Sequence, residues 1–155
     1  MELVDKLRGK RICIDTAPFI YFIEKDPKYL SIVRPIFAEI DAGNIESLTS
    51  TITLLEVLVL PFKTINESLA EEYREILLHA EGLTTYEIVH EISELAAKLR
   101  AKYTIRTPDA IQMAVGILYN ADTFLTNDSG LKKVKDIKVV TLEDFLGGKT
   151  LNLKT

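Results

Sequence analysis

Arg11-Ile-Cys-Ile-Asp15 is the stretch of sequence that decides the fold of this chain. A short, continuous apolar run of this kind is typical of a strand buried in a parallel sheet. Pro18 follows closely and predicts a helix to about Glu24, since proline is tolerated in the first turn, where its missing N–H needs no partner. The run therefore predicts an α/β fold that begins with a buried strand and a helix.

Strands and helices continue to alternate along the rest of the chain. Gly, Pro and capping residues divide the segments. The clearest helix start is Thr107-Pro108-Asp109, which supplies a cap, a proline at the first position and an acid in the first turn. We expect helices at 27–42, 51–61, 66–80, 86–103 and 107–119, strands at 47–50, 123–126 and 137–140, and a last short helix from Thr141. This order predicts a parallel sheet with helices on both faces.

Length and composition indicate one globular domain spanning residues 1–155. Hydrophobic residues make up 47% of the chain and charged residues 27%, and we find no repeat, low-complexity segment or linker. The apolar runs are too short to cross a membrane, and the charged start, Met-Glu-Leu-Val-Asp-Lys, lacks the apolar core of a signal peptide. A single cysteine, Cys13, cannot form an internal disulfide. We therefore expect a cytoplasmic protein with no membrane partner.

The formal net charge of −4 bears on the class of partner. Domains held to nucleic acid mainly by bulk positive charge are usually basic, so a simple nucleic-acid-binding module is disfavoured. A site built from carboxylates contributes negative charges of its own, and a bound divalent cation reverses the local field. The charge is therefore compatible with a metal-dependent nuclease.

Four acidic residues fall where the predicted fold can bring them to one edge of the sheet. Ligands of such sheets bind at the carboxyl ends of the strands. Asp15 ends the first strand and Asp128 follows the strand at 123–126, so topology alone places both at that edge. Glu56 and Asp109 lie in helices next to strands, where the sequence permits the same edge without forcing it.

Each acid also has an ordinary structural interpretation. Asp15 could cap a helix, Asp109 could complement a helix dipole, and Asp128 in Asn127-Asp128-Ser129-Gly130 could belong to a turn. Glu56 differs, because its helical neighbours three and four residues away are almost all apolar. We expect it to be buried, and a buried carboxylate needs a partner or a metal ion.

Carboxylates gathered in this way suit a hard divalent cation. Mg²⁺ and Mn²⁺ prefer carboxylate and water oxygens, and Mg²⁺ usually takes one or two carboxylates while keeping several waters. Four acids could hold one or two ions, and two-metal phosphodiester cleavage uses ions about 3.5–4 Å apart. The predicted cofactor is therefore Mg²⁺ or Mn²⁺.

These segments match a known family. In order along the chain, four of them resemble the motif segments of PIN domains: Ile14-Asp15-Thr16, Thr51-Ile-Thr-Leu-Leu-Glu56-Val, Arg106-Thr107-Pro108-Asp109-Ala110 and Leu125-Thr126-Asn127-Asp128. Glu94-Leu-Ala-Ala-Lys-Leu-Arg100 resembles the helix that precedes the third motif in VapC toxins. Each motif is short, but their order and spacing together are specific, and the resemblance covers nearly the whole chain.

The resemblance implies a fold and a set of site residues. The fold is a parallel, roughly five-stranded sheet with helices on both sides. Thr16 and Thr126 would support the site by hydrogen bonds. The fourth acid varies most across the family, and Asp122 lies close enough in the sequence to compete with Asp128 for that role. The implied metal ligands, which are also the catalytic residues, are Asp15, Glu56, Asp109 and Asp128.

The resemblance also implies a function and partners. It predicts a divalent-metal-dependent endoribonuclease that acts on RNA, the toxin of a VapBC-type toxin–antitoxin pair. The alternatives are a PIN-domain nuclease in RNA processing without an antitoxin, and a catalytically silent nucleic-acid-binding module. Phe19–Ile23 and Leu54–Leu60 are apolar around much of each helix, which fits either deep core helices or a groove for an amphipathic partner helix. VapC-type toxins form homodimers and are blocked by an antitoxin near these helices.

Overall fold

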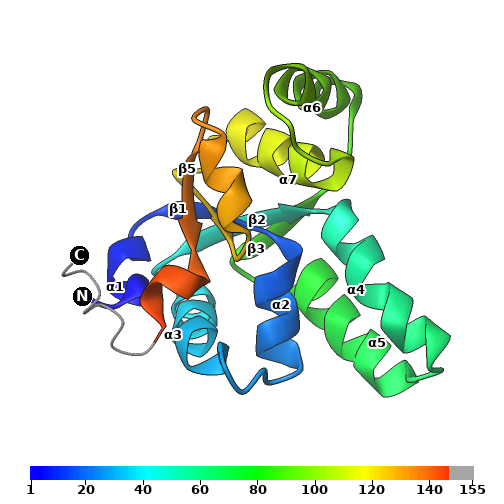
Figure 1. The fold of residues 1–155 in the computed structure, drawn as a ribbon. Coiled ribbons are helices and arrows are strands. Elements are labelled where there is room, and N and C mark those ends of the chain that lie inside the picture. The colour runs from blue at the N-terminus through cyan, green and yellow to red at the C-terminus, as the bar shows by residue number, and fades with distance from the viewer. Residues whose placement is uncertain (147–155) are drawn as a thin grey trace.

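The computed structural model of the chain describes residues 1–146, so the last part of the expected domain, 147–155, lies outside the described residues. Strands and helices alternate along almost the whole chain (Figure 1). The elements are α1 (Leu3–Leu7), β1 (Arg11–Ile14), α2 (Thr16–Ile23), α3 (Leu30–Asp41), β2 (Glu46–Ser50), α4 (Thr51–Lys63), α5 (Glu67–Arg74), the π-helical turn η1 (Glu75–His79), β3 (Leu83–Tyr86), α6 (His90–Lys102), α7 (Thr107–Leu118), β4 (Thr123–Thr126), the 3₁₀ turn η2 (Ser129–Lys133), β5 (Lys138–Thr141) and the 3₁₀ turn η3 (Leu142–Phe145).

The five strands form one parallel sheet in the order β3-β2-β1-β4-β5. Strand β1 lies at the centre, where Ile12 is the neighbour of Ser47 on one side and Thr123 on the other. All five strands therefore end at the same edge of the sheet, which is called the carboxyl edge below, and they begin at the opposite, amino edge. The α/β class and the parallel five-stranded sheet predicted from the sequence are confirmed.

The two faces of the sheet carry separate hydrophobic cores. Because successive side chains of a strand point to opposite faces, Ile12 and Ile14 pack into the core beneath α1, α2 and α3, and Cys13 packs into the core beneath α6 and α7. Figure 1 shows α6 and α7 on one side of the sheet and α2 and α3 on the other. Ile12, Cys13 and Ile14 of β1 are fully buried between the two layers of helices, as the apolar run predicted.

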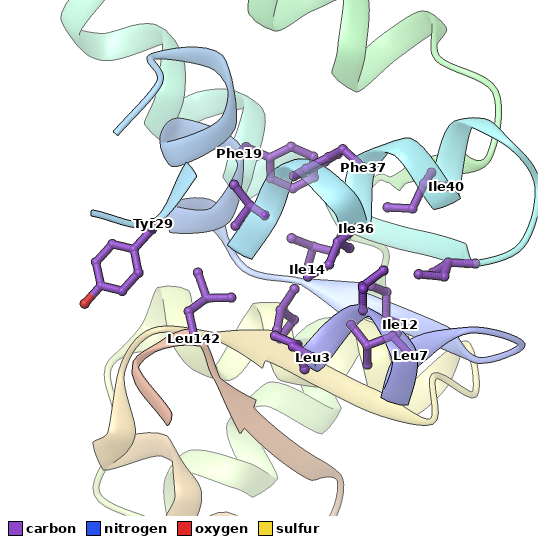
Figure 2. Packing of buried hydrophobic residues seen from close by; sticks show 14 of the residues in the cluster. Leu3, Leu7, Ile12, Ile14, Phe19, Tyr29, Ile36, Phe37, Ile40 and Leu142 are labelled. Carbon is purple, nitrogen blue, oxygen red and sulfur yellow. The ribbon is translucent and has the colours of Figure 1, made fainter. Parts of the chain in front are cut away.

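The first core fixes the position of α2, the helix that begins at the end of β1. Figure 2 shows Ile14 beneath Ile36, with Phe19 of α2 beside Phe37 of α3. The Phe19 and Phe37 ring centroids lie 5.4 Å apart. Full burial of a side chain such as Phe or Ile stabilises a fold by about 1.5–3 kcal/mol. The packing therefore sets the direction in which the chain leaves β1 at the carboxyl edge.

Strand β3 was not predicted from the sequence. The expected helix at 86–103 begins only at His90, and Tyr86 instead ends β3, which pairs with β2 alone. Leu83-Thr-Thr-Tyr86 contains residues that favour strands, but it is short and lacks the continuous apolar run from which the central strand was predicted. The short helix α1 was likewise absent from the prediction, although Leu3, Val4 and Leu7 are buried.

Several helix boundaries also differ from the prediction: α3, for example, begins at Leu30 instead of residue 27, and α5 ends at Arg74 instead of residue 80. Helix α2 begins at Thr16 instead of Pro18, because Asp15 caps it. Helix α4 begins at Thr51, and Ser50 caps it by accepting a hydrogen bond from the N–H of Ile52. Helix α4 continues through Pro61 to Lys63, since a proline near the end of a helix removes only one late hydrogen bond. Within residues 1–146, no helix is both long and apolar enough to cross a membrane.

Candidate metal centre

Asp15 stands at the carboxyl edge with both of its carboxylate oxygens held. Its Oδ1 accepts a hydrogen bond from the N–H of Thr16 at 2.8 Å, which caps α2. Its Oδ2 accepts from the buried Thr126 hydroxyl at 2.7 Å. Its own N–H donates to the carbonyl of Leu125 at 2.9 Å, which continues the pairing of β1 with β4. Asp15 is thus a helix cap and, at the same time, a rigidly oriented carboxylate.

The charge of Asp15 is influenced by two other candidate acids. Burial raises the pKa of Asp15 above its ordinary value, and the negative charges of Asp109 and Glu56 raise it further. The hydrogen bonds from Thr126 and from the N–H of Thr16 act in the opposite direction. Asp109 and Glu56 therefore lie close enough to Asp15 to disfavour its charged form.

Asp109 lies in the first turn of α7 and is only 7% exposed. Its Oδ2 accepts a hydrogen bond from Nε of Arg106 at 3.1 Å. The pKa of Arg106 is raised, first by this hydrogen bond and the charge of Asp109, and also by the charges of Asp128 and Glu56. The exposed guanidinium of Arg106 is therefore a counter-ion shared by three of the four candidate acids.

Glu56 reaches the same edge from α4. Its Oε1 accepts a hydrogen bond from the Thr16 hydroxyl at 2.6 Å. The prediction that Glu56 is buried was wrong, because the residue is exposed. Its apolar neighbours on the helix face solvent with it, since Val59 is 53% and Leu60 52% exposed. Glu56 therefore needs no buried partner. The exposure of the apolar residues around it on α4 has to be explained separately.

Asp128 and Asp122 lie at opposite edges of the sheet. Asp128 follows β4, accepts a hydrogen bond from the N–H of Gly130 at 2.9 Å, and donates its own N–H to the Thr126 hydroxyl at 3.1 Å. Asp122 precedes β4 and accepts from the N–H of Arg11, the first residue of β1, at 2.9 Å. Of these two residues, only Asp128 shares the carboxyl edge with Asp15. Its hydrogen bond with the N–H of Gly130 shows that it also forms the turn that the sequence indicated.

The side chains at the carboxyl edge fit a hard divalent cation by donor type. Within residues 1–146, no group of three or more His, Cys, Asp or Glu side chains is already arranged to hold a metal ion. Mg²⁺ requires only one or two carboxylates and retains waters for its other positions. Asp15 and its neighbours offer oxygen donors alone, which is the donor set that Mg²⁺ and Mn²⁺ prefer.

Sequence reasoning missed a buried polar network behind these acids. Gln112 of α7 is 1% exposed, and its Oε1 accepts a hydrogen bond from the Ser50 hydroxyl at 2.6 Å. Its Nε2 donates to the hydroxyls of Thr53 at 2.7 Å and Thr16 at 3.3 Å. The available signal was an amide between the apolar residues Ile111 and Met113, one helical turn after Asp109.

Comparisons with known proteins agree with this architecture. The PIN domain family model matches residues 12–137. The comparison with curated proteins found no match. Among solved structures, the chain is similar to VapBC2 from Rickettsia felis bound to a promoter DNA fragment, with a TM-score of 0.67 and 18% identity over 84% of this chain and 98% of the other. A toxin–antitoxin complex from Klebsiella pneumoniae gives a TM-score of 0.64 and 22% identity over 85% and 97%. DNA-bound VapBC from Salmonella typhimurium gives 0.62 and 15% over 86% and 98%. At these identities the likeness to solved structures concerns the fold.

Proposed function

The chain belongs to the PIN domain family, and from this premise we propose that it is a divalent-metal-dependent endoribonuclease, the toxin of a VapBC-type pair. The observation that carries the proposal is the convergence of acids at the carboxyl edge, where Thr16 donates hydrogen bonds to both Asp15 and Glu56, and where Asp109 and Glu56 raise the pKa of Asp15. One exposed guanidinium, that of Arg106, faces these carboxylates, and a divalent cation would relieve the remaining repulsion that Asp109 and Glu56 exert on Asp15.

In the proposed centre, Mg²⁺ or Mn²⁺ would be held by Asp15, Glu56, Asp109 and Asp128. When bound, such an ion supplies a more acidic water and neutralises charge that develops on a phosphodiester. Thr126 and the N–H of Thr16 keep the two oxygens of Asp15 in a fixed orientation. The exposed guanidinium of Arg106 can bind a phosphate oxygen of the RNA backbone beside the acids.

The test is cleavage of single-stranded RNA by the purified protein, with Mg²⁺ or Mn²⁺ and with excess EDTA. We expect metal-dependent cleavage that Asp15→Asn or Asp109→Asn abolishes, because each change removes a carboxylate charge from a shared site. Cleavage at an undiminished rate in EDTA would contradict the proposal. Failure of the folded wild-type protein to bind Mn²⁺ would instead favour the catalytically silent module.

The outer face of α4 supports a protein partner. Leu55, Val59 and Phe62 follow one another at helical spacing and are 61%, 53% and 55% exposed. A contiguous exposed apolar face on a globular domain marks an interaction surface. We propose that a second copy of the chain covers it, which gives the expected homodimer a physical basis.

Helix α2 differs from α4 in this respect. Phe19 is fully buried, so the part of Phe19–Ile23 that faces the sheet is core. Phe22 and Ile23 instead line a surface groove with Ile76 of η1, and the acids Glu71, Glu72 and Glu75 also line it. We propose that this groove receives an antitoxin helix that is apolar on one side and basic along its margin. The structural neighbours named as toxin–antitoxin complexes are consistent with such a partner.

The oligomeric state tests the α4 proposal. Leu55→Glu should shift the full-length protein from dimer to monomer in sedimentation velocity, because it places a charge in the buried centre of the interface. Since Leu55 is 61% exposed in the single chain, the melting temperature of the monomer should not fall. Lys63→Glu, a charge change at the end of the same helix, is the control and should leave the dimer intact. A wild-type protein that stays monomeric at high concentration would refute the proposal.

A further inference from the structure

We propose that Gln112 is a positioning residue of the candidate metal centre, which acts through the Thr16 hydroxyl to orient the carboxylate of Glu56. The inference rests on the proposed nuclease function. It concerns a side chain that touches none of the four candidate acids, since its hydrogen-bond partners are Ser50, Thr53 and Thr16.

The direction of the Gln112 amide is set at its Ser50 end. The Ser50 hydroxyl oxygen accepts the N–H of Ile52 at 3.1 Å, and its single proton goes to Oε1 of Gln112 at 2.6 Å. A reversed amide would leave that serine proton without an acceptor in a fully buried place. The capping residue of α4 therefore directs the Nε2 donor of Gln112 toward Thr16 and Thr53.

Two branches leave the amide nitrogen, and each has one direction because a hydroxyl carries one proton. In the first branch Thr53 receives the amide proton and donates to Thr49 at 2.8 Å, and Thr49 donates to the carbonyl of Ile14 at 2.8 Å. In the second branch Thr16 receives the amide proton at 3.3 Å and donates its own to Oε1 of Glu56 at 2.6 Å. The first branch ends on backbone, and the second ends on a candidate metal ligand.

The second branch does more than satisfy buried polar groups. Glu56 is exposed on α4, and across residues 1–146 the Thr16 hydroxyl is the hydrogen-bond donor that holds its carboxylate. A long exposed side chain without such a donor samples many rotamers, and ordering it opposes metal binding. Groups that orient the ligands of a metal typically change metal affinity or activity by about 10–100-fold. Gln112 acts one bond further away, so we expect the lower end of that range.

The experiment compares three variants of the full chain. Gln112→Glu keeps the shape and the acceptor for Ser50 but replaces the amide donor by a second acceptor, which draws the Thr16 proton away from Glu56. Gln112→Met removes both polar atoms of the amide without adding a charge. It therefore tests the proposal even if the buried charge prevents Gln112→Glu from folding. Thr49→Val is the matched control, because it cuts the branch that ends on the Ile14 carbonyl. The two branches also meet in a 3.4 Å contact between the Thr16 and Thr53 hydroxyls, but the Thr16–Glu56 hydrogen bond and its Gln112 donor stay in place. Mn²⁺ affinity is measured by electron paramagnetic resonance of the free ion, and folding by thermal melts in EDTA.

We expect Gln112→Glu to weaken Mn²⁺ binding about 10-fold and Gln112→Met by a smaller factor, with cleavage reduced through a higher Mn²⁺ requirement. Thr49→Val should lower the melting temperature while leaving Mn²⁺ affinity at the wild-type value. If the folded Gln112 variants bind Mn²⁺ as tightly as Thr49→Val while the wild type binds Mn²⁺ and cleaves RNA, the positioning role is refuted and the nuclease proposal stands. If the wild type neither binds Mn²⁺ nor cleaves RNA, both are refuted.

Discussion

Asp122 and Asp128 bracket the same strand, β4, and differ mainly in the edge of the sheet that they occupy. Both are exposed, and each accepts a hydrogen bond from a backbone N–H, Asp122 from Arg11 and Asp128 from Gly130. Asp122 lies where β1 begins, and Asp128 lies near Thr126, which holds the acid that follows β1. Two aspartates with similar local chemistry therefore have different surroundings, and the parallel topology alone decides which one can join a site.

The largest expected difference between the two edges comes from changing these two aspartates in parallel. Asp128→Asn should reduce metal-dependent RNA cleavage by about 10–100-fold, because it removes a carboxylate charge from the carboxyl edge. Asp122→Asn should leave cleavage at the wild-type rate, since its carboxylate lies at the amino edge. Initial cleavage rates at fixed Mn²⁺ give the comparison.

Both variants keep an oxygen that can accept the backbone hydrogen bond, so melts in EDTA should show similar stability. Equal loss of cleavage in the two variants would mean that the edge does not define the site.

A smaller effect, on Mn²⁺ affinity, is expected when a cationic side chain is removed from one edge or the other. Arg106→Ala should strengthen Mn²⁺ binding in the absence of RNA by about threefold, because the guanidinium competes with the metal for Asp109, Asp128 and Glu56 and exposed ion pairs are weak. Lys138→Ala, at the start of β5, removes a cation from the amino edge and should not change the affinity. Titration of both variants with Mn²⁺ measures the difference.

If the guanidinium contacts a phosphate, Arg106→Ala should weaken RNA binding, whereas it strengthens Mn²⁺ binding. Weaker Mn²⁺ binding in Arg106→Ala would show that Arg106 supports the acids instead of competing with the metal.

The smallest effect concerns stability without metal. The pKa of Asp15 in the folded protein is raised above its ordinary value of 3.8, so the folded state binds this proton more tightly than the unfolded state. Its destabilising contribution is therefore present at neutral pH and is lost as pH falls through the folded pKa toward about 4. Asp15→Asn should be more stable relative to wild type at neutral pH than at acidic pH, by about 2–4 °C for about 1 kcal/mol.

Melts of both proteins in EDTA from pH 7.5 down to pH 4.5 provide the measurement. Altered hydrogen bonds to Thr126 and Thr16 shift the melting temperature of Asp15→Asn by an amount that does not depend on pH. The diagnostic quantity is therefore the change with pH in the difference between the two melting temperatures. A difference that stays constant over this range would contradict the raised pKa.

Much of the fold could be predicted from the sequence, because its signals are local. The apolar run at 11–14 predicted the central strand, and Thr107-Pro108-Asp109 predicted the start of α7, although Arg106 and not Thr107 occupies the cap position. Strand β3 could not be predicted in the same way, because Leu83–Tyr86 becomes a strand through its pairing with β2. The carboxyl-edge position of Asp15 followed from strand order, and that of Asp109 required the packed structure.

The parts of the candidate site that were missed depend on distant contacts. Gln112 joins Ser50, Thr53 and Thr16, which come from segments far apart in the sequence, so no local pattern reveals the network. The apolar character of α4 was visible in the sequence, but a helix buried in the core and a helix at an interface give the same apolar pattern. The exposure of Leu55 and Val59 excludes the core interpretation for this face of α4, because nothing within the described chain covers them.

The central place of β1 has a consequence for incomplete chains. A fragment that stopped before Thr123 would keep Asp15, Glu56 and Asp109 but would lack the strand that pairs with Ile12, Cys13 and Ile14 on one side. Those residues would then form an open edge of consecutive apolar side chains, a template for intermolecular strand pairing. Nonsense mutations ahead of β4 should therefore yield insoluble fragments instead of soluble ones.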